Sequence, residues 1–124
     1  VVFNELFVDW DEPVVLVEGL FDAIVAGQNA IPILGSTLRE ESKLFQAIVL
    51  NDSPVYLALD EDAIKKQEQM IRVFYRYDVD VKVIDTRNVE DVGSMSKEQF
   101  NKRMSLAYEP DIDEINFFRQ LAKI

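Results

Sequence analysis

The sequence contains no cysteine and no histidine. Disulfide bonds and zinc sites built from these residues are therefore excluded, as is catalysis by a thiol nucleophile or by an imidazole. Any bound metal ion must be held by oxygen ligands, which favours Mg²⁺, Mn²⁺ or Ca²⁺. A general base must be the side chain of an Asp, Glu, Lys or Tyr.

Long apolar runs and an excess of basic residues are absent as well. No run approaches the roughly 20 apolar residues that a membrane helix needs, and the N-terminus lacks a signal-peptide pattern. We therefore expect a cytoplasmic protein without membrane contact. The net charge of −10 is opposite in sign to that of an isolated basic nucleic-acid-binding domain. Contact with phosphates would require metal ions, local basic residues or a neighbouring domain.

The composition that is present is globular, with 48% hydrophobic and 29% charged residues in a chain of 124. This length suits a single domain. We expect its core over residues 13–93 and a C-terminal helical extension over residues 96–124. Because the sequence does not begin with Met, we expect it to be a fragment of a longer protein.

Apolar runs and helical patterns alternate along the chain after a short extended or hairpin lead-in. Continuous apolar runs are typical of strands covered on both faces. Pro32 favours an edge position or a strand start, and the outward alternation of Asp80 and Lys82 favours a half-solvated edge strand. The predicted strands are Val14–Val17, Ile31–Leu34, Val55–Leu59 and Val79–Ile84; the predicted helices are Phe21–Ala26, Leu38–Leu50, Asp62–Tyr77, one opened by Ser96 as its N-cap, and Ile112–Ile124.

This alternation predicts an α/β fold with a mostly parallel four-stranded sheet flanked by helices. The carboxyl ends of parallel strands share one edge, where ligands bind. Glu18 follows the first strand, and Asp60 and Asp62 follow the third. Asp91 lies in the polar loop after the fourth strand. Neighbouring strands lie about 4.8 Å apart, so Glu18 and Asp60 would reach one ion if their strands are adjacent, with Asp62 facing a second ion.

Carboxylates this close repel one another, which raises the pKa of at least one of them unless a cation binds. A divalent ion removes the conflict, and one or two such ions stabilise the attacking and leaving oxygens in phosphoryl transfer. The alternative is that Asp60 and Asp62 only cap the following helix, where acids interact favourably with the helix dipole. The presence of Glu18 after a second buried strand favours the metal site.

Other residues near these acids have two interpretations each. Asp22, one helical turn after the first acid, either bonds the Gly19 region and orients the site or is a solvated acid. Gly35-Ser36-Thr37 either offers backbone amides to a phosphate or forms an ordinary turn. Lys65 and Lys66 either meet phosphates or lie exposed on a helix face.

Three segments carry a combined pattern. Val14–Ala23 is an apolar strand with Glu-Gly and an Asp four residues after the Glu, Ile31–Thr37 contains a Leu-Gly-Ser turn, and Leu57–Asp62 ends in Asp-x-Asp. Together they resemble a Toprim domain, the catalytic domain shared by DNA primases, type IA and II topoisomerases and some nucleases. The resemblance covers residues 13–93 and is greatest to bacterial and phage primases, although Ile64 stands where primases often have glycine.

The resemblance implies a Toprim-like (Rossmann-like) fold with a two-ion site for Mg²⁺ or Mn²⁺. Glu18 would be a metal ligand and the general acid or base. Asp60 and Asp62 would bind metal and complete the catalytic set, and Asp91 would be a further metal ligand. The residues that would support the site and its cofactor are Gly19, Asp22 and Gly35.

The implied activity is that of a primase-type nucleotidyltransferase that synthesises RNA primers. Single-stranded DNA template and ribonucleoside triphosphates would bind through the full-length protein, in a bacterial host cell if phage-encoded, with a replicative helicase as a further partner. The zinc-binding module and basic subdomain of primases are not in this sequence, so we expect the fragment alone to prime poorly. The alternatives are a Toprim nuclease that cleaves phosphodiesters and a non-catalytic acidic α/β regulatory or binding module.

Overall fold

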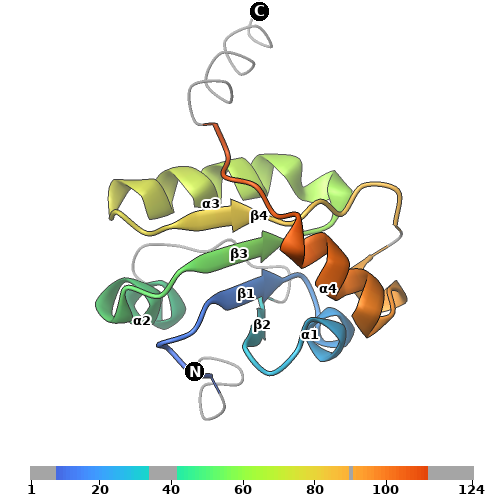
Figure 1. The fold of residues 1–124 in the computed structure, drawn as a ribbon. Coiled ribbons are helices and arrows are strands. Elements are labelled where there is room, and N and C mark those ends of the chain that lie inside the picture. The colour runs from blue at the N-terminus through green and yellow to red at the C-terminus, as the bar shows by residue number, and fades with distance from the viewer. Residues whose placement is uncertain (1–7, 34–41, 90, 112–124) are drawn as a thin grey trace, which may run out of the picture.

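The computed structural model describes residues 8–33, 42–89 and 91–111. The centre of the molecule is a parallel sheet in the strand order β2-β1-β3-β4 (Figure 1). The predicted α/β fold with a parallel four-stranded sheet and flanking helices is confirmed. The strands are β1 (Val14–Val17), β2 (Ala30–Pro32), β3 (Val55–Ala58) and β4 (Val81–Val83), within a residue or two of the predicted boundaries.

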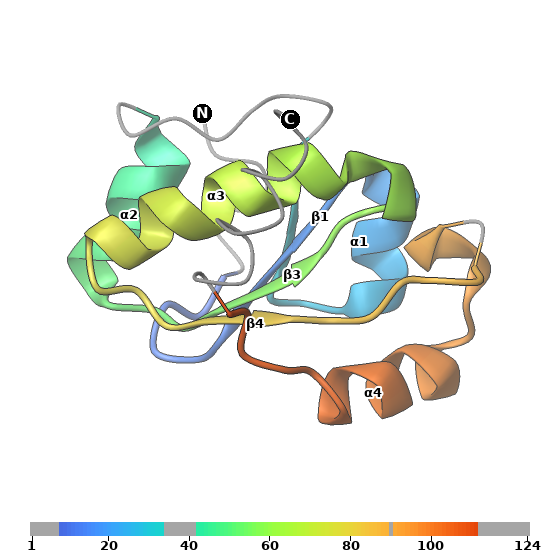
Figure 2. The same cartoon turned by 90° about the horizontal axis from the view of Figure 1, so that it is seen from above.

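Helices cover both faces of the sheet, because side chains alternate between the faces along each strand. Val14 and Leu16 pack on the side of α2 and α3, whereas Val15 and Val17 pack on the side of α1 and α4. All four side chains are buried, as the continuous apolar run predicted. Figure 2 shows α3 and α4 on opposite sides of the sheet. The helices are α1 (Leu20–Ala26), α2 (Lys43–Asn51), α3 (Ile64–Arg76) and α4 (Lys97–Ser105).

Both edges of the sheet agree with the sequence pattern. β2 is an edge strand and ends at Pro32, which has no N–H to donate to a further strand. β4 forms the other edge, with Lys82 exposed between two buried valines. Beyond β4, the backbones of Val83 and Tyr108 exchange two hydrogen bonds of 2.8 and 3.0 Å in an antiparallel bridge. This bridge, which was not predicted, covers part of an exposed strand edge.

Side-chain caps set where two helices begin. The hydroxyl of Ser96 accepts a hydrogen bond of 3.0 Å from the backbone N–H of Gln99, which confirms the predicted N-cap of α4. The hydroxyl of Ser42 accepts one of 3.1 Å from Phe45, so α2 begins just after Ser42. The prediction of one continuous helix from Leu38 is therefore wrong, because the capping residue has an extended backbone.

The helix predicted from Asp62 begins instead at Ile64, because a 3₁₀ turn, η1 (Glu61–Ala63), precedes it. Residues 8–13 of the predicted lead-in contain no strand. No helix in the described ranges combines the length and apolar content needed to cross a membrane. The predicted turn Gly35-Ser36-Thr37 and the predicted helix Ile112–Ile124 lie outside the described residues.

Candidate active site

Two carboxylates follow neighbouring strands at the carboxyl end of the sheet. Glu18 comes directly after β1, and Asp60 follows β3 after one further buried residue, Leu59. β1 and β3 are adjacent, with Val17 opposite Ala58. Glu18 and Asp60 were predicted to lie close together if their strands are neighbours, and β1 and β3 are neighbours. We call these two residues the acid pair.

Each member of the acid pair has one buried oxygen that has no hydrogen-bond partner among the described residues, Oε1 of Glu18 and Oδ1 of Asp60. Buried polar atoms in folded proteins are nearly always bonded, because an unsatisfied one costs about 1–3 kcal/mol. The other oxygen of Glu18 lies 3.4 Å from the ammonium of Lys66, whose side chain is only 20% exposed. The acid pair thus retains acceptor capacity that the described part of the chain does not use.

The pKa of Asp60 is raised from 3.8 to about 6. Burial is the largest cause, because it disfavours the charged form, and neighbouring negative charges add to it. A proton or a cation at this position would relieve the repulsion. The carboxylates that contribute, in decreasing order, are Asp22, Glu18, Asp62 and Asp91.

Asp22 lies close to the acid pair, but backbone amides satisfy both of its oxygens. Oδ2 accepts a hydrogen bond of 3.0 Å from the N–H of Gly19, and Oδ1 accepts one of 2.6 Å from the N–H of Gly93. The side chain is 6% exposed. The prediction that Asp22 bonds the Gly19 region is confirmed, and a solvated Asp22 is wrong. We call this arrangement the Asp22 bridge.

Glycine at position 93 allows a close approach of its backbone to α1. A Cβ atom at Gly93 would lie 3.1 Å from Oδ1 of Asp22 and 3.3 Å from Cβ of Phe21. Both contacts are tighter than ordinary van der Waals separation, and the second involves an atom fixed to the backbone. The Asp22 bridge therefore joins the start of α1 to the turn after β4 at a distance that a larger residue would disturb.

The remaining predicted acids have different surroundings. Asp91 caps a short 3₁₀ turn, η2 (Val92–Ser94), by accepting a hydrogen bond of 2.8 Å from the N–H of Ser94. Asp62 is exposed in η1. Asp60 occupies the N-cap position of η1, but its side chain makes no capping hydrogen bond. Asp60 therefore does not cap the turn through a side-chain hydrogen bond, whereas the alternative that Asp60 and Asp62 interact with the helix dipole stays an interpretation of the sequence.

Among the residues that the structure describes, no three acidic side chains converge closely enough to hold a metal ion. Asp22 and Asp91 are within electrostatic reach of Asp60, yet both are bonded to backbone amides. The donors that fit a divalent cation are the unpartnered oxygens of the acid pair, and hard cations complete their shells with water or substrate oxygens. The set Glu18, Asp60, Asp62 and Asp91 stays a prediction.

The glycines and lysines that were predicted to support the site or to contact phosphate have different surroundings. Gly19 takes part in the Asp22 bridge through its amide. Lys66 pairs with Glu18 and does not lie free on the helix face, whereas Lys65 is exposed. Gly35 lies outside the described residues.

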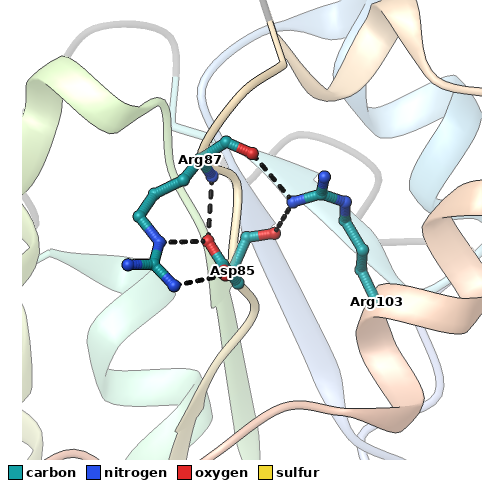
Figure 3. A network of polar contacts seen from close by, with 3 residues as sticks. All are labelled: Asp85, Arg87 and Arg103. Atoms are coloured by element: carbon teal, nitrogen blue, oxygen red, sulfur yellow. Dashed lines mark hydrogen bonds and ion pairs between the residues drawn. The ribbon is translucent and has the colours of Figure 1, made fainter.

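A charged network near the acids was missed by sequence reasoning (Figure 3). The guanidinium of Arg87 donates hydrogen bonds of 3.0 and 2.9 Å to the two carboxylate oxygens of Asp85. These bonds lower the pKa of Asp85 to about 2. Nη1 of Arg103, from α4, donates to the backbone carbonyls of Asp85 at 2.7 Å and Arg87 at 3.1 Å. The only sequence signal was the presence of basic residues in two segments whose contact the fold creates.

Comparison with known proteins identifies a solved structure of similar fold. No family model matches the chain, and no curated protein matches it. The crystal structure of the zinc-binding and RNA polymerase domains of the Aquifex aeolicus primase is similar, with a TM-score of 0.65 and 21% identity. The similarity covers 88% of this chain and 29% of that chain. The fold is therefore primase-like, and the chain spans less than a third of the length of this neighbour.

Proposed function

We propose that this chain is the Toprim-type catalytic domain of a phage or bacterial DNA primase and performs metal-dependent nucleotidyl transfer on nucleic acid. The observation that carries the proposal is the acid pair at the carboxyl ends of adjacent parallel strands, with two buried oxygens that no described residue bonds. That edge is where open α/β sheets bind ligands. The primase-like fold supports the same assignment.

The acid pair would hold Mg²⁺ or Mn²⁺, with Asp62 two residues beyond Asp60 available to a second ion or to metal-bound water. A bound divalent ion supplies positive charge to the phosphoryl oxygens as they become more negative. Asp22 positions the start of α1 and thereby the turn that carries Glu18. Lys66 partly neutralises Glu18 and so lowers the repulsion within the acid pair.

Because its pKa is raised, the carboxyl group of Asp60 can bind a cation in place of a proton and can also transfer a proton near neutral pH. With a pKa of about 6, a fraction of the molecules carries a proton on Asp60 in the absence of metal. Cations compete with that proton for the same carboxyl group, so metal binding should release protons and strengthen with rising pH. A phosphate oxygen near Asp60 would also have a proton donor or acceptor in reach.

Thermal unfolding with and without millimolar Mn²⁺ tests the metal site without requiring activity. A ligand present at ten times its Kd stabilises the native state by about 1.4 kcal/mol, which corresponds to a rise in Tm of about 5 °C. Asp60→Asn and Glu18→Gln should abolish that rise. Asp52→Asn is the matched control, because Asp52 is exposed at the end of α2 in a left-handed conformation that Asn also adopts. Equal metal responses in all four proteins would refute the site.

The reaction type is tested on a protein that contains this chain together with its flanking domains. A labelled single-stranded DNA is incubated with ribonucleoside triphosphates and Mn²⁺, and the products are separated by size. New RNA that depends on Glu18 and Asp60 supports the primase. Shortening of the labelled DNA with the same dependence would instead identify a Toprim nuclease.

A further inference from the structure

A pocket of about 730 Å³ lies between the loop after β4 and helix α4. Its charged lining consists of Arg87, Lys102 and Arg103 with one carboxylate, Asp85, so that three positive charges face one negative charge. The whole chain carries a net charge of −10. This region, which we call the basic pocket, is therefore opposite in sign to the molecule around it. Its volume is within the range of sites for small ligands.

The cations of the basic pocket are held in different ways. Arg103 is fixed by the two backbone carbonyls that accept from its Nη1. Arg87 is oriented by its two-bond contact with Asp85, while 73% of its side chain remains exposed. Lys102 makes no side-chain hydrogen bond or ion pair with any residue in the described ranges. The pocket thus combines two guanidinium groups that are held by hydrogen bonds with an ammonium group that no described residue bonds.

An aromatic ring completes the lining. Tyr108 is 52% exposed, although its backbone is held by two hydrogen bonds to Val83. A partly exposed ring on a fixed backbone offers a flat face at a low entropic cost, and such faces stack on nucleobases. Cationic groups for phosphate and an aromatic face for a base are together the two elements of nucleotide recognition.

The basic pocket adjoins two smaller pockets that are lined in part by Asp60. A second pocket of about 500 Å³ is lined by Asp85, Arg87 and Tyr108 as well as by Asp60. A third, of about 330 Å³, joins Asp60 to Val89, which also lines the basic pocket. The shared lining residues place the basic pocket next to the pockets that Asp60 lines.

We propose that the basic pocket binds a nucleotide unit, with its phosphate against Lys102 and the exposed part of Arg87 and its base on Tyr108. This proposal deepens the proposed function and rests on it for the direction of the ligand toward Asp60. The shared chemistry is a phosphate joined to a base, and its source is either one unit of a single strand or a free nucleoside triphosphate.

Binding is measured without divalent ions, in EDTA at low salt, so that the result does not depend on the metal site. The probe is a fluorescently labelled oligothymidylate followed by anisotropy, with unlabelled ATP as competitor. Lys102→Glu should weaken binding at least tenfold, Tyr108→Ala about fivefold, and Tyr108→Phe by less than twofold. Lys43→Glu is the matched control, because Lys43 is exposed on α2, across the sheet from α4; it should change binding less than threefold. Thermal unfolding confirms that each variant is folded.

The outcomes separate the sources of the ligand. If ATP displaces the oligothymidylate at concentrations near those at which the oligothymidylate half-saturates the protein, the ligand is a free nucleotide. If the oligothymidylate binds and ATP does not displace it, the ligand is a single strand. Absence of binding by the labelled oligothymidylate, or equal weakening by Lys43→Glu and Lys102→Glu, overturns the proposal. The Mn²⁺ response is measured by thermal unfolding and nucleotide binding is measured in EDTA, so failure of the metal site is distinguished from failure of the basic pocket.

Discussion

The acid pair and the Asp22 bridge lie at the same end of the sheet and use the same chemical group, yet their carboxylates have opposite surroundings. Both oxygens of Asp22 accept hydrogen bonds from backbone amides. Glu18 and Asp60 each keep a buried oxygen without a partner. Backbone amides make a buried carboxylate a structural group, and their absence leaves it able to take a proton, a cation or a substrate donor.

This difference separates a carboxylate that stabilises the fold from one that is available for function, at the same end of the sheet. Asp22 stabilises the native state because its hydrogen bonds join α1 to the turn after β4. Asp60 opposes folding at neutral pH because burial and four neighbouring carboxylates disfavour its charge. A destabilised charged group at a ligand-binding edge is a frequent property of active sites.

The largest effect is expected from removing the Asp22 bridge. Asp22→Ala should lower the free energy of unfolding by about 3 kcal/mol, because two charge-assisted hydrogen bonds to partly buried amides are lost at about 1.5 kcal/mol each. The corresponding fall in Tm is about 10 °C. Asp62→Ala, at an exposed acid of the same edge, should change stability by less than about 0.5 kcal/mol. Equal losses in a denaturant titration of the two variants would contradict the comparison.

A substitution of Asp60 is expected to raise the free energy of unfolding rather than lower it. Asp60→Asn should raise the free energy of unfolding at pH 8 without metal by about 1–2 kcal/mol, because the buried negative charge is removed. Asp52→Asn should leave it within about 0.5 kcal/mol. Urea denaturation of the three proteins measures both values, and a marked destabilisation by Asp60→Asn would mean that this carboxylate has a structural role.

The pH dependence of the free energy of unfolding tests the raised pKa of Asp60 directly. The pKa of Asp60 is about 6 in the native state, against 3.8 in the unfolded chain. At pH values between these two, the native state therefore binds more protons than the unfolded state. The free energy of unfolding should therefore rise as the pH falls from 7 to 5, by about 1 kcal/mol more in the wild type than in Asp60→Asn. Asp85, with a pKa of about 2, loses its contribution only below about pH 4. Parallel pH profiles of the two proteins would exclude the raised pKa.

The smallest effect is expected at the exposed ion pair. Arg87→Gln should change the free energy of unfolding by less than about 0.5 kcal/mol, because the side chains of Arg87 and Asp85 are 73% and 40% exposed and solvent screens them. The pKa of Asp85 should nevertheless return toward 3.8, which carboxyl chemical shifts measured against pH would detect. Lys82→Gln, at an exposed residue of β4, is the control and should leave that pKa unchanged.

Several features of the site were predictable because they depend on local pattern. The apolar runs before Glu18 and Asp60 located both acids at strand ends, and the four-residue spacing of Asp22 from Glu18 gave its bond to the Gly19 region as one of two interpretations. The second partner of Asp22, Gly93, was not predictable, because 71 residues separate the two. Its position depends on how the turn after β4 packs against α1.

The basic pocket was hidden for a similar reason. Arg87 lies in a loop and Lys102 in a helix, and neither segment carries a basic run. They line one pocket because Arg103 bonds the loop and because Tyr108 pairs with the edge strand. Each of these contacts joins segments that are remote in the chain.

The sequence by itself determined the α/β alternation, the edge strands and which carboxylates reach the carboxyl end of the sheet, because these follow from apolar periodicity along short segments. The tertiary structure alone decided which of those carboxylates are satisfied. A hydrogen bond requires placement within a few tenths of an ångström, and long-range packing sets that placement. Asp22 and Asp60 therefore look equivalent in the sequence, and only the position of backbone amides makes one structural and leaves the other free to bind.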